Sequence, residues 1–299
     1  MPIKPGKKER ENLWRLLEMA RDEDLAGSGD VTSEVVPVDT RATARFVARQ
    51  PMVVCGVELL EAIALCYDGQ LRTEVRSPEG AQVQRGELLA FWRGPARGIM
   101  SAERVALNFL QRLSGVATTT REYVDAIAGS GAEIYDTRKT TPGWRELEKY
   151  AVRVGGGRNH RKGLYDAVLI KDNHLAVLAK SEGMDPIKAV ARELQRVLPY
   201  LSDHAFVELE VDTLEQCQAA LALPVDIILL DNMTLDELRQ AVAMRDQTGL
   251  KGRIELEASG GITLATAPQV ALTGVERISV GALTHSAGAV DIALDIEVD

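Results

Sequence analysis

The chain places two cations side by side at the end of a strand-like run. Arg138 and Lys139 follow the apolar run EIY and precede a Pro-Gly break. The whole chain is acidic, with a formal charge of −9, yet nine lysines and arginines fall between residues 138 and 171, against three acidic residues. Because guanidinium and ammonium groups bind carboxylates and phosphates, this local excess predicts a site for a substrate with several negative charges.

A glycine-rich segment lies within the same stretch. VGGGRNHRKG (154–163) combines three consecutive glycines with His160 and Arg161. Glycines allow backbone N–H groups to approach an anion, and arginine offers a planar fork of donors. The glycines alone are a weak signal. Together with Lys171, which ends the next apolar run, they strengthen the prediction of an anion site.

Some of these cations have a simpler interpretation. Arg145, Lys149 and Arg153 recur every four residues with two glutamates nearby, which is typical of a solvated helix face. That interpretation does not cover Arg138 and Lys139, because these follow a strand-like run. The paired cations are therefore the stronger candidates for binding a substrate.

Two carboxylates, Glu210 and Asp231, also stand at the ends of apolar runs. They would repel a polyanion unless a divalent cation intervened, and Mg²⁺ binds one or two carboxylates together with substrate phosphates. The sequence therefore predicts Mg²⁺ at these two residues and a phosphorylated sugar or nucleotide as substrate. Surface acids at strand ends are the alternative interpretation. Alternation places Glu208 on the same strand face as Glu210, so the pattern does not choose between them.

Six short apolar runs beyond residue 130 must position these groups. They alternate with helix-like segments, which indicates a parallel sheet, open or closed into a barrel. Polar groups follow or end each run, and in an α/β barrel the carboxyl ends of all strands face the active site. The runs are AEIYD (132–136), DAVLIKD (166–172), AFVELEV (205–211), DIILLDN (226–232), RIELEAS (253–259) and ERISVGAL (276–283).

The first part of the chain has another pattern. Residues 10–26 show helical spacing, residues 45–94 mix strand-like and helical stretches, and residues 100–128 are helix-like throughout. We place a domain boundary at Ser114-Gly115, inside the last of these segments. The fold class predicted for the whole chain is α/β, in two domains.

The composition argues against several classes of protein. No run of 18 apolar residues is present, and the first residues lack the apolar core of a secretory signal, so neither a membrane span nor secretion is expected. The negative charge and an aromatic content of 4% argue against a nucleic-acid partner. Three scattered cysteines predict a reducing, cytoplasmic location and no zinc site.

Several motifs, in their order along the chain, resemble the quinolinate phosphoribosyltransferase family. The resemblance covers nearly the whole chain and is strongest in YDTRKTTPGWRELEKYAVRVGGGRNHRKGLYDAVLIKDNH (135–174). The other matching segments are EDLAGSGDVTSE (23–34), ERVALNFLQRLSGVAT (103–118), VELEV, ILLDN, EASGGIT and SVGALTH. The family catalyses attack of the ring nitrogen of quinolinate on C1 of phosphoribosyl pyrophosphate (PRPP). With Mg²⁺ present, pyrophosphate and CO₂ leave and nicotinate mononucleotide forms, a step of de novo NAD biosynthesis.

The resemblance also implies an architecture. An N-terminal α/β sandwich domain, residues 1–114, is expected to be joined by the C-terminal tail, residues 286–299. Residues 115–285 are expected to form the catalytic domain, a TIM-like parallel α/β barrel of fewer than eight strands. The family implies a homodimer with shared active sites, in which the N-terminal domain of one chain closes the barrel mouth of the other. Assembly of dimers into a hexamer stays open.

The resemblance implies a role for each matching residue. Arg104 resembles an arginine that the neighbouring subunit lends to a quinolinate carboxylate, and Lys139 resembles a ligand of the pyrophosphate of PRPP. Glu210 and Asp231 resemble the groups that hold the ribose and the metal, and they complete the catalytic set with Lys139. The remaining quinolinate pocket would be Arg138, His160, Arg161 and Lys171, and the 5′-phosphate site would be Ser259, Gly260, Gly281 and His285.

Three other functions fit parts of the pattern. A nicotinate-specific phosphoribosyltransferase would form the same product without decarboxylation, but a substrate with one carboxylate needs fewer cations. A paralogue of the same fold could use another phosphoribosyl acceptor. A catalytically silent phosphosugar-binding protein is disfavoured because Lys139, Glu210 and Asp231 are all present. His174 is expected to be structural.

Overall fold

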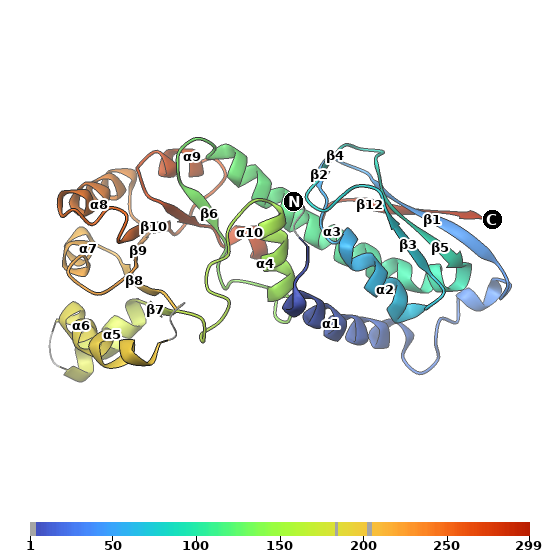
Figure 1. The fold of residues 1–299 in the computed structure, drawn as a ribbon, viewed down its shortest axis with the longest axis horizontal. Helices are drawn as coiled ribbons and strands as arrows, with labels where there is room; N and C mark the ends of the chain where they lie inside the picture. Colours follow the sequence, from blue (N-terminus) through green and yellow to red (C-terminus); the bar gives the residue numbers. More distant parts are fainter. Residues whose placement is uncertain (1–3, 183–184, 202–204) are drawn as a thin grey trace. The chain divides into compact units, whose positions relative to one another are not determined.

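The computed structural model describes residues 4–182, 185–201 and 205–299. Two compact units make up the chain (Figure 1). The first unit comprises Met1–Glu122, Lys139–Gly157 and Ala282–Asp299, and the second comprises Tyr123–Arg138 and Arg158–Gly281. Helix α3 (Ala96–Ala126) runs unbroken through Ser114 and Gly115. The domain boundary predicted at Ser114-Gly115 stays a prediction.

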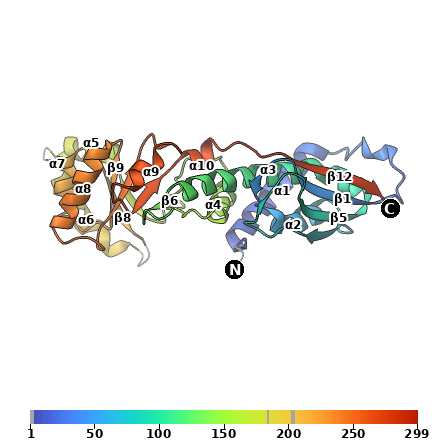
Figure 2. The ribbon, with the colours of Figure 1, turned by 90° about the horizontal axis from the view of Figure 1, so that it is seen from above.

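The first unit is built on a four-stranded antiparallel sheet of order β12-β1-β5-β3. Strand β1 has the sequence RATARFVA, in which every second residue is buried. This is the period of a strand that has one face covered by the core. Figure 2 shows β12 beside β1, and the two pair antiparallel from Ala42–Val298 to Ala48–Ile292. The strands are β1 (Arg41–Ala48), β3 (Arg72–Val75), β5 (Leu88–Pro95) and β12 (Ile292–Val298), with a separate pair β2 (Met52–Val53) and β4 (Gln82–Val83).

Helices complete the first unit. In α3, the buried residues Ile99, Ala102, Ala106, Leu110 and Leu113 recur at intervals of three or four, so one stripe of a long helix faces the core. The other helices of this unit are α1 (Lys7–Leu25), α2 (Leu60–Tyr67), α4 (Arg145–Val154) and α10 (Ala282–His285), with single 3₁₀ turns η1 (Ser33–Val35) and η2 (Val57–Leu59).

The structure corrects one interpretation of the cationic stretch. Lys149 is not on a solvated helix face: its side chain is fully buried in α4. Arg153 pairs with Glu9 of α1 at 2.7 Å, and Glu9 is itself buried. Helical spacing alone predicted an exposed charged face, but the packing of α4 within the first unit covers most of it.

The second unit is a six-stranded parallel sheet of order β6-β11-β10-β9-β8-β7. Each of the six predicted apolar runs supplies one strand, which confirms the predicted parallel α/β barrel of fewer than eight strands. Strands β6 and β7 are the two ends of this order, so the sheet is not a closed eight-stranded barrel. The strands are β6 (Glu133–Tyr135), β7 (Val168–Ile170), β8 (Val207–Val211), β9 (Ile227–Asp231), β10 (Glu255–Ser259) and β11 (Arg277–Ser279).

Helices follow most of these strands, as the parallel order requires. Helix α8 begins with a complete capping box, in which the Thr234 hydroxyl accepts from Glu237 N–H and the Glu237 carboxylate accepts from Thr234 N–H. The helices are α5 (Asp172–Glu182), α6 (Pro186–Val197), α7 (Leu214–Ala220), α8 (Leu235–Gln247) and α9 (Ala267–Ala271), with a 3₁₀ turn η3 (Leu198–Tyr200). Among the helices that the structure describes, none is long and apolar enough to cross a membrane.

Candidate active site

One face of the second sheet carries ionisable side chains on neighbouring strands. Glu208 pairs with Ile227, Glu257 pairs with Leu229 and Arg277 pairs with Glu257 in the parallel register. Paired residues of parallel strands point to the same side, and every second residue shares that side. The residues that this register places on one face are Glu208, Glu210, Asp231, Glu257, Ser259 and Arg277.

A buried cluster of charges lies at the centre of this face. His160 Nε2 is 2.8 Å from Glu208 Oε2 and 3.6 Å from Glu257 Oε1, and the side chains of both glutamates are fully buried. Arg277 Nε donates to Glu257 Oε2 at 2.7 Å. The Arg277 guanidinium also lies 3.8 Å from the centre of the Tyr135 ring. Two carboxylates therefore face one arginine and one histidine away from water.

Burial controls the protonation of this cluster. It raises the pKa of Glu208 to about 7, although Arg277, Arg161 and Lys171 act in the opposite direction. Burial also raises the pKa of Glu257, and the neighbouring Glu208 carboxylate adds to this effect. The ligand atoms of His160, Glu208 and Glu257 lie within 4.8 Å of one another, a spacing that could hold a metal ion. The guanidinium of Arg277 already compensates Glu257, so we assign these residues to the protein's own charge network.

The loop that carries His160 and Arg161 is fixed to the end of β6. Asp136 is fully buried, and its carboxylate accepts from Asn159 Nδ2 at 2.7 Å and from His160 N–H at 2.8 Å. His160 Nδ1 accepts from Arg161 N–H at 2.7 Å. The remaining proton of a neutral imidazole is then on Nε2, which faces Glu208. His160 thus orients the backbone of Arg161 while its ring contacts the buried carboxylates.

Two arginines of this unit, Arg138 and Arg161, lie close to each other. Burial lowers the pKa of Arg161, and the positive charge of Arg138 lowers it further. Arg161 is only 7% exposed, and its Nη1 donates to the carbonyl of Ala167 at 3.3 Å. Arg138 Nε is buried and has no hydrogen-bond acceptor in the described structure. This arrangement is suited to bind an anion. An anion would reduce the repulsion between the two guanidinium groups, and it would accept a hydrogen bond from the buried Arg138 Nε.

The carboxylates predicted from the sequence lie on adjacent strands. Glu210 is the penultimate residue of β8, which is buried throughout, and accepts a hydrogen bond from Lys171 Nζ. Asp231 ends β9 and accepts from Asn232 Nδ2 at 2.7 Å. Asn232 adopts a left-handed conformation with φ 55°, and its N–H donates to the Ser259 carbonyl at 2.9 Å. Sheet register and this turn together present both carboxylates at the carboxyl ends of their strands.

Small residues shape the loop after β10. Gly260 has φ +93°, and a Cβ built there would lie 2.2 Å from Asn232 Oδ1, so only glycine fits. Ser259, Gly260 and Gly261 contribute to a cavity of about 220 Å³ beside the N-terminus of α8. Gly281 lies two residues beyond the end of β11, and the residue between them, Val280, donates its N–H to the Tyr135 carbonyl at 2.9 Å.

Three predicted site residues belong to the first unit. Arg104 is exposed on α3, and Lys139 has an exposed side chain. The carbonyl of Lys139 accepts a hydrogen bond from the Thr284 hydroxyl at 2.8 Å. His285 is exposed at the end of α10, with its Nδ1 2.6 Å from the Ser286 hydroxyl. The other nine predicted residues belong to the second unit.

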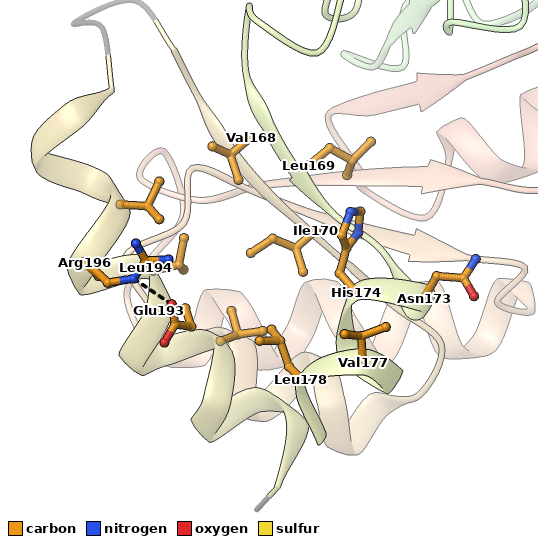
Figure 3. A pocket seen from close by; sticks show the side chains of 12 residues that line it. Val168, Leu169, Ile170, Asn173, His174, Val177, Leu178, Glu193, Leu194 and Arg196 are labelled. Atoms are coloured by element: carbon orange, nitrogen blue, oxygen red, sulfur yellow. Dashed lines mark hydrogen bonds and ion pairs between the residues drawn. The ribbon is translucent and has the colours of Figure 1, made fainter. Parts of the chain in front are cut away.

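An apolar cavity of about 550 Å³ lies between β7, α5 and α6, apart from the charged face. Figure 3 shows Ile170, Val177 and Leu178 around it, with the ion pair of Glu193 and Arg196 at its border. Its apolar lining does not suit a highly charged substrate. His174 borders this cavity, and its Nδ1 accepts from Lys171 N–H at 3.0 Å, which is a structural contact of the expected kind.

Sequence reasoning did not select three residues of this region: Asp136, Glu257 and Arg277. A signal existed for Glu257, which stands two residues before Ser259 and therefore shares its strand face. Arg277 had no such signal, because its partner on β10 lies 20 residues away in the chain. Glu208, which the pattern could not separate from Glu210, forms the buried contact to His160, whereas Glu210 pairs with Lys171.

Comparison with known proteins gives one consistent result. A family model described as quinolinate phosphoribosyl transferase, N-terminal domain, matches residues 30–114, and its C-terminal counterpart matches residues 116–295. The chain is 42% identical over 285 residues to a nicotinate-nucleotide pyrophosphorylase (carboxylating) of Mycobacterium leprae, covering 94% of this chain and 95% of the relative. It is 39% identical over 284 residues to a probable enzyme of the same name from Bacillus subtilis, covering 95% and 93%.

A solved structure agrees with these sequence matches. The nicotinate-nucleotide pyrophosphorylase from Francisella tularensis superposes with a TM-score of 0.85 at 34% identity. The match covers 96% of this chain and 97% of that chain. Fold and sequence therefore point to the same group of proteins over almost the full length.

Proposed function

This chain belongs to the quinolinate phosphoribosyltransferase family, and from that premise we propose how its individual residues serve the reaction. As a member of this family, the protein is an enzyme that transfers a phosphoribosyl group from PRPP to quinolinate. The ring nitrogen attacks C1 of PRPP, and pyrophosphate leaves. Loss of CO₂ then leaves an electron pair at C2, which takes a proton from water and gives nicotinate mononucleotide for NAD biosynthesis.

The pair of Arg138 and Arg161 is the observation that supports the acceptor site most strongly. Burial and mutual repulsion leave two guanidinium groups in need of negative charge, and the buried Arg138 Nε needs an acceptor. Quinolinate carries two adjacent carboxylates, which would meet both demands with charge-assisted hydrogen bonds. We place the pyridine dicarboxylate at these two arginines, with Lys171 beside it and His160 holding the Arg161 backbone.

The donor side of the reaction uses the remaining predicted residues. Lys139 binds the pyrophosphate of PRPP and stabilises its charge as it leaves. Glu210 and Asp231 hold the ribose and stabilise positive charge on C1, because carboxylates favour the developing cation. Ser259, Gly260, Gly281 and His285 bind the 5′-phosphate. The support for this last group is the cavity of about 220 Å³ that Ser259 and Gly260 help to line.

Decarboxylation needs little from the protein. The electron pair left at C2 when CO₂ departs lies next to a ring nitrogen that glycosylation has made positive. The substrate itself therefore stabilises this charge, and the residues need only orient the ring and exclude competing geometries. The network around His160 serves this purpose, because it fixes Arg161 through backbone and side-chain contacts.

Mg²⁺ fits the carboxylates that the sequence selected. Glu210 and Asp231 offer hard oxygen ligands at the ends of adjacent strands, the donor set that Mg²⁺ accepts together with substrate phosphates. Lys171 already donates to Glu210, so this lysine and the ion would share that carboxylate. When bound, the ion would neutralise charge on the pyrophosphate of PRPP.

One assay tests the proposed acceptor and the metal. Purified protein is given PRPP and Mg²⁺ with either quinolinate or nicotinate, and pyrophosphate and CO₂ are measured. We expect equal amounts of both products from quinolinate, little turnover of nicotinate, and loss of turnover after chelation of Mg²⁺. Pyrophosphate from nicotinate alone would contradict the dicarboxylate assignment. Turnover that survives chelation would contradict the metal assignment.

We further propose that the active unit is a homodimer in which Arg104 of one chain serves the site of the other. An arginine that is exposed on α3 of its own unit is consistent with this role. We also propose a cytoplasmic location, which the free thiols of Cys55, Cys66 and Cys217 support.

Mixing two inactive variants tests the shared site. Arg104→Ala and Lys139→Ala chains should each have little activity. If Arg104 acts on the partner's substrate, mixed dimers contain one site with both residues intact, and about a quarter to a half of the wild-type rate should return after subunit exchange. Exchange is followed with two differently labelled chains. Complete exchange without any recovery of activity would exclude sharing of the site.

A further inference from the structure

The segment Lys139–Thr141 is held at each of its three residues. The Thr284 hydroxyl donates to the Lys139 carbonyl at 2.8 Å. Arg145 Nε donates to the Thr140 hydroxyl at 3.0 Å. The carboxylate of Glu148 accepts from Thr141 N–H at 3.0 Å and from the Thr141 hydroxyl at 2.9 Å. Elements α10 and α4 therefore both fix this segment, and all of these residues belong to the first unit.

One arginine joins these separate contacts. Arg112 of α3 donates through Nη2 to Glu148 Oε1 at 2.6 Å and also to the Thr284 carbonyl. Its Nη1 donates to the Ala287 carbonyl at 2.6 Å. Glu148 and Thr284 are fully buried, whereas the side chain of Arg112 is 24% exposed. The same guanidinium thus ties α4 to α10 at the two points that hold Lys139 and Thr141.

We propose that Arg112, Glu148 and Thr284 are positioning residues for Lys139. They form a clamp that fixes the backbone of residues 139–141 and so sets the point from which the lysine side chain reaches the pyrophosphate. This inference rests on the role of Lys139 in the proposed function. None of the three side chains needs to contact a substrate.

The physical need for such a clamp follows from the lysine itself. Its ammonium sits on a flexible four-carbon stem, so the side chain alone does not define where the charge lies. Catalysis by a placed charge depends on geometry, and a displacement of about 1 Å can cost about 100-fold in rate. A buried carboxylate that binds both the N–H and the hydroxyl of Thr141 is a rigid support, because breaking it would leave polar groups unpaired away from water.

The test removes one hydroxyl and keeps the shape. Thr284→Val deletes the bond to the Lys139 carbonyl, and Thr284→Ser keeps it. Thr120→Val is the matched control, because Thr120 is also fully buried and its hydroxyl also donates to a carbonyl at 2.8 Å, that of Val116 in its own helix. Each variant is assayed for kcat and KM with quinolinate and PRPP, for binding of pyrophosphate by calorimetry, and for its thermal unfolding midpoint.

We expect Thr284→Val to lower kcat about 10- to 100-fold and to weaken pyrophosphate binding, with the KM for quinolinate within about twofold of wild type. Thr284→Ser should restore most of the rate. Thr120→Val should lose comparable stability and keep its rate. Equal values of kcat for the two valine variants would overturn the clamp. A loss of kcat in both variants, in proportion to the fall in their unfolding midpoints, would also overturn it.

A second variant covers the case in which Thr284→Val fails to fold. Glu148→Gln keeps the volume and an oxygen for Arg112 but replaces one acceptor at Thr141, so it acts on the same segment without changing α10. The same loss of kcat and of pyrophosphate binding is expected, and a wild-type rate for a folded Glu148→Gln protein would overturn the proposal. Lys139→Ala is measured in parallel. Normal turnover by that variant would refute the role of Lys139 in the proposed function and would leave the clamp without a purpose. A slow Lys139→Ala enzyme beside wild-type rates for Thr284→Val and Glu148→Gln would overturn the clamp alone.

Discussion

Replacing Lys139 with alanine should lower kcat for PRPP-dependent turnover of quinolinate by about 10²- to 10³-fold, the range found when one charge-stabilising donor is removed from an active site. The physical reason is that pyrophosphate accumulates negative charge as its bond to C1 breaks, and the Lys139 ammonium stabilises that charge. Initial rates of pyrophosphate release at saturating substrates would measure the change.

The folded state should survive this substitution. The Lys139 side chain is exposed, and the bond from Thr284 goes to the main-chain carbonyl, which alanine retains. Lys251→Ala is the matched control, because Lys251 is an exposed lysine that pairs only loosely with Asp246 at 3.7 Å. Its rate should equal that of wild type. A Lys139→Ala enzyme within about threefold of the control would remove Lys139 from the catalytic set.

The largest effect on stability is expected at Arg277. Replacing it with leucine should lower the free energy of unfolding by about 3–5 kcal/mol, because breaking a buried ion pair leaves an uncompensated charge. Glu257 would lose the guanidinium 2.7 Å from its Oε2, and its contact with His160 Nε2 is longer, at 3.6 Å. Denaturant unfolding at neutral pH would measure the loss.

Two further variants test whether the loss of stability comes from the burial of the ion pair or from losing any ion pair. Arg158→Leu breaks the pair of Arg158 with Glu133, which are 62% and 46% exposed, and should cost no more than about 1 kcal/mol. Adding Glu257→Leu to Arg277→Leu removes both members of the buried pair and should recover much of the stability. If Arg277→Leu were no more harmful than Arg158→Leu, the buried network would not support the sheet.

The positions of the six parallel strands could be predicted because each is a short apolar run followed by polar residues. Glu210 and Asp231 were found for the same reason, since a strand end is visible in the local pattern. The contact of Arg277 with Glu257 could not be found in this way. It depends on β10 and β11 being neighbours in register, which is a property of the sheet and not of either segment.

Other differences also come from tertiary packing. The spacing of Arg145, Lys149 and Arg153 predicts that they share one helix face. Spacing alone cannot predict which other element packs against that face. The structure shows Lys149 buried and Arg153 paired with Glu9 of α1, more than 140 residues earlier in the chain. Asp136 was passed over because its role is to bind the loop at 159–160, and no local signal links those residues.

The pairing of β12 with β1 has a consequence for the order of folding. A ribosome synthesises Arg41–Ala48 before the strands of the second unit, but it synthesises the partner strand, Ile292–Val298, after them. All of the second unit's strands are made in the interval. Such non-local closure is slow, and an uncovered strand edge is open to pairing with other chains until it occurs. The sheet of the first unit can therefore be completed only after the second unit has been made, so the nascent chain carries an open β edge while the second unit is synthesised.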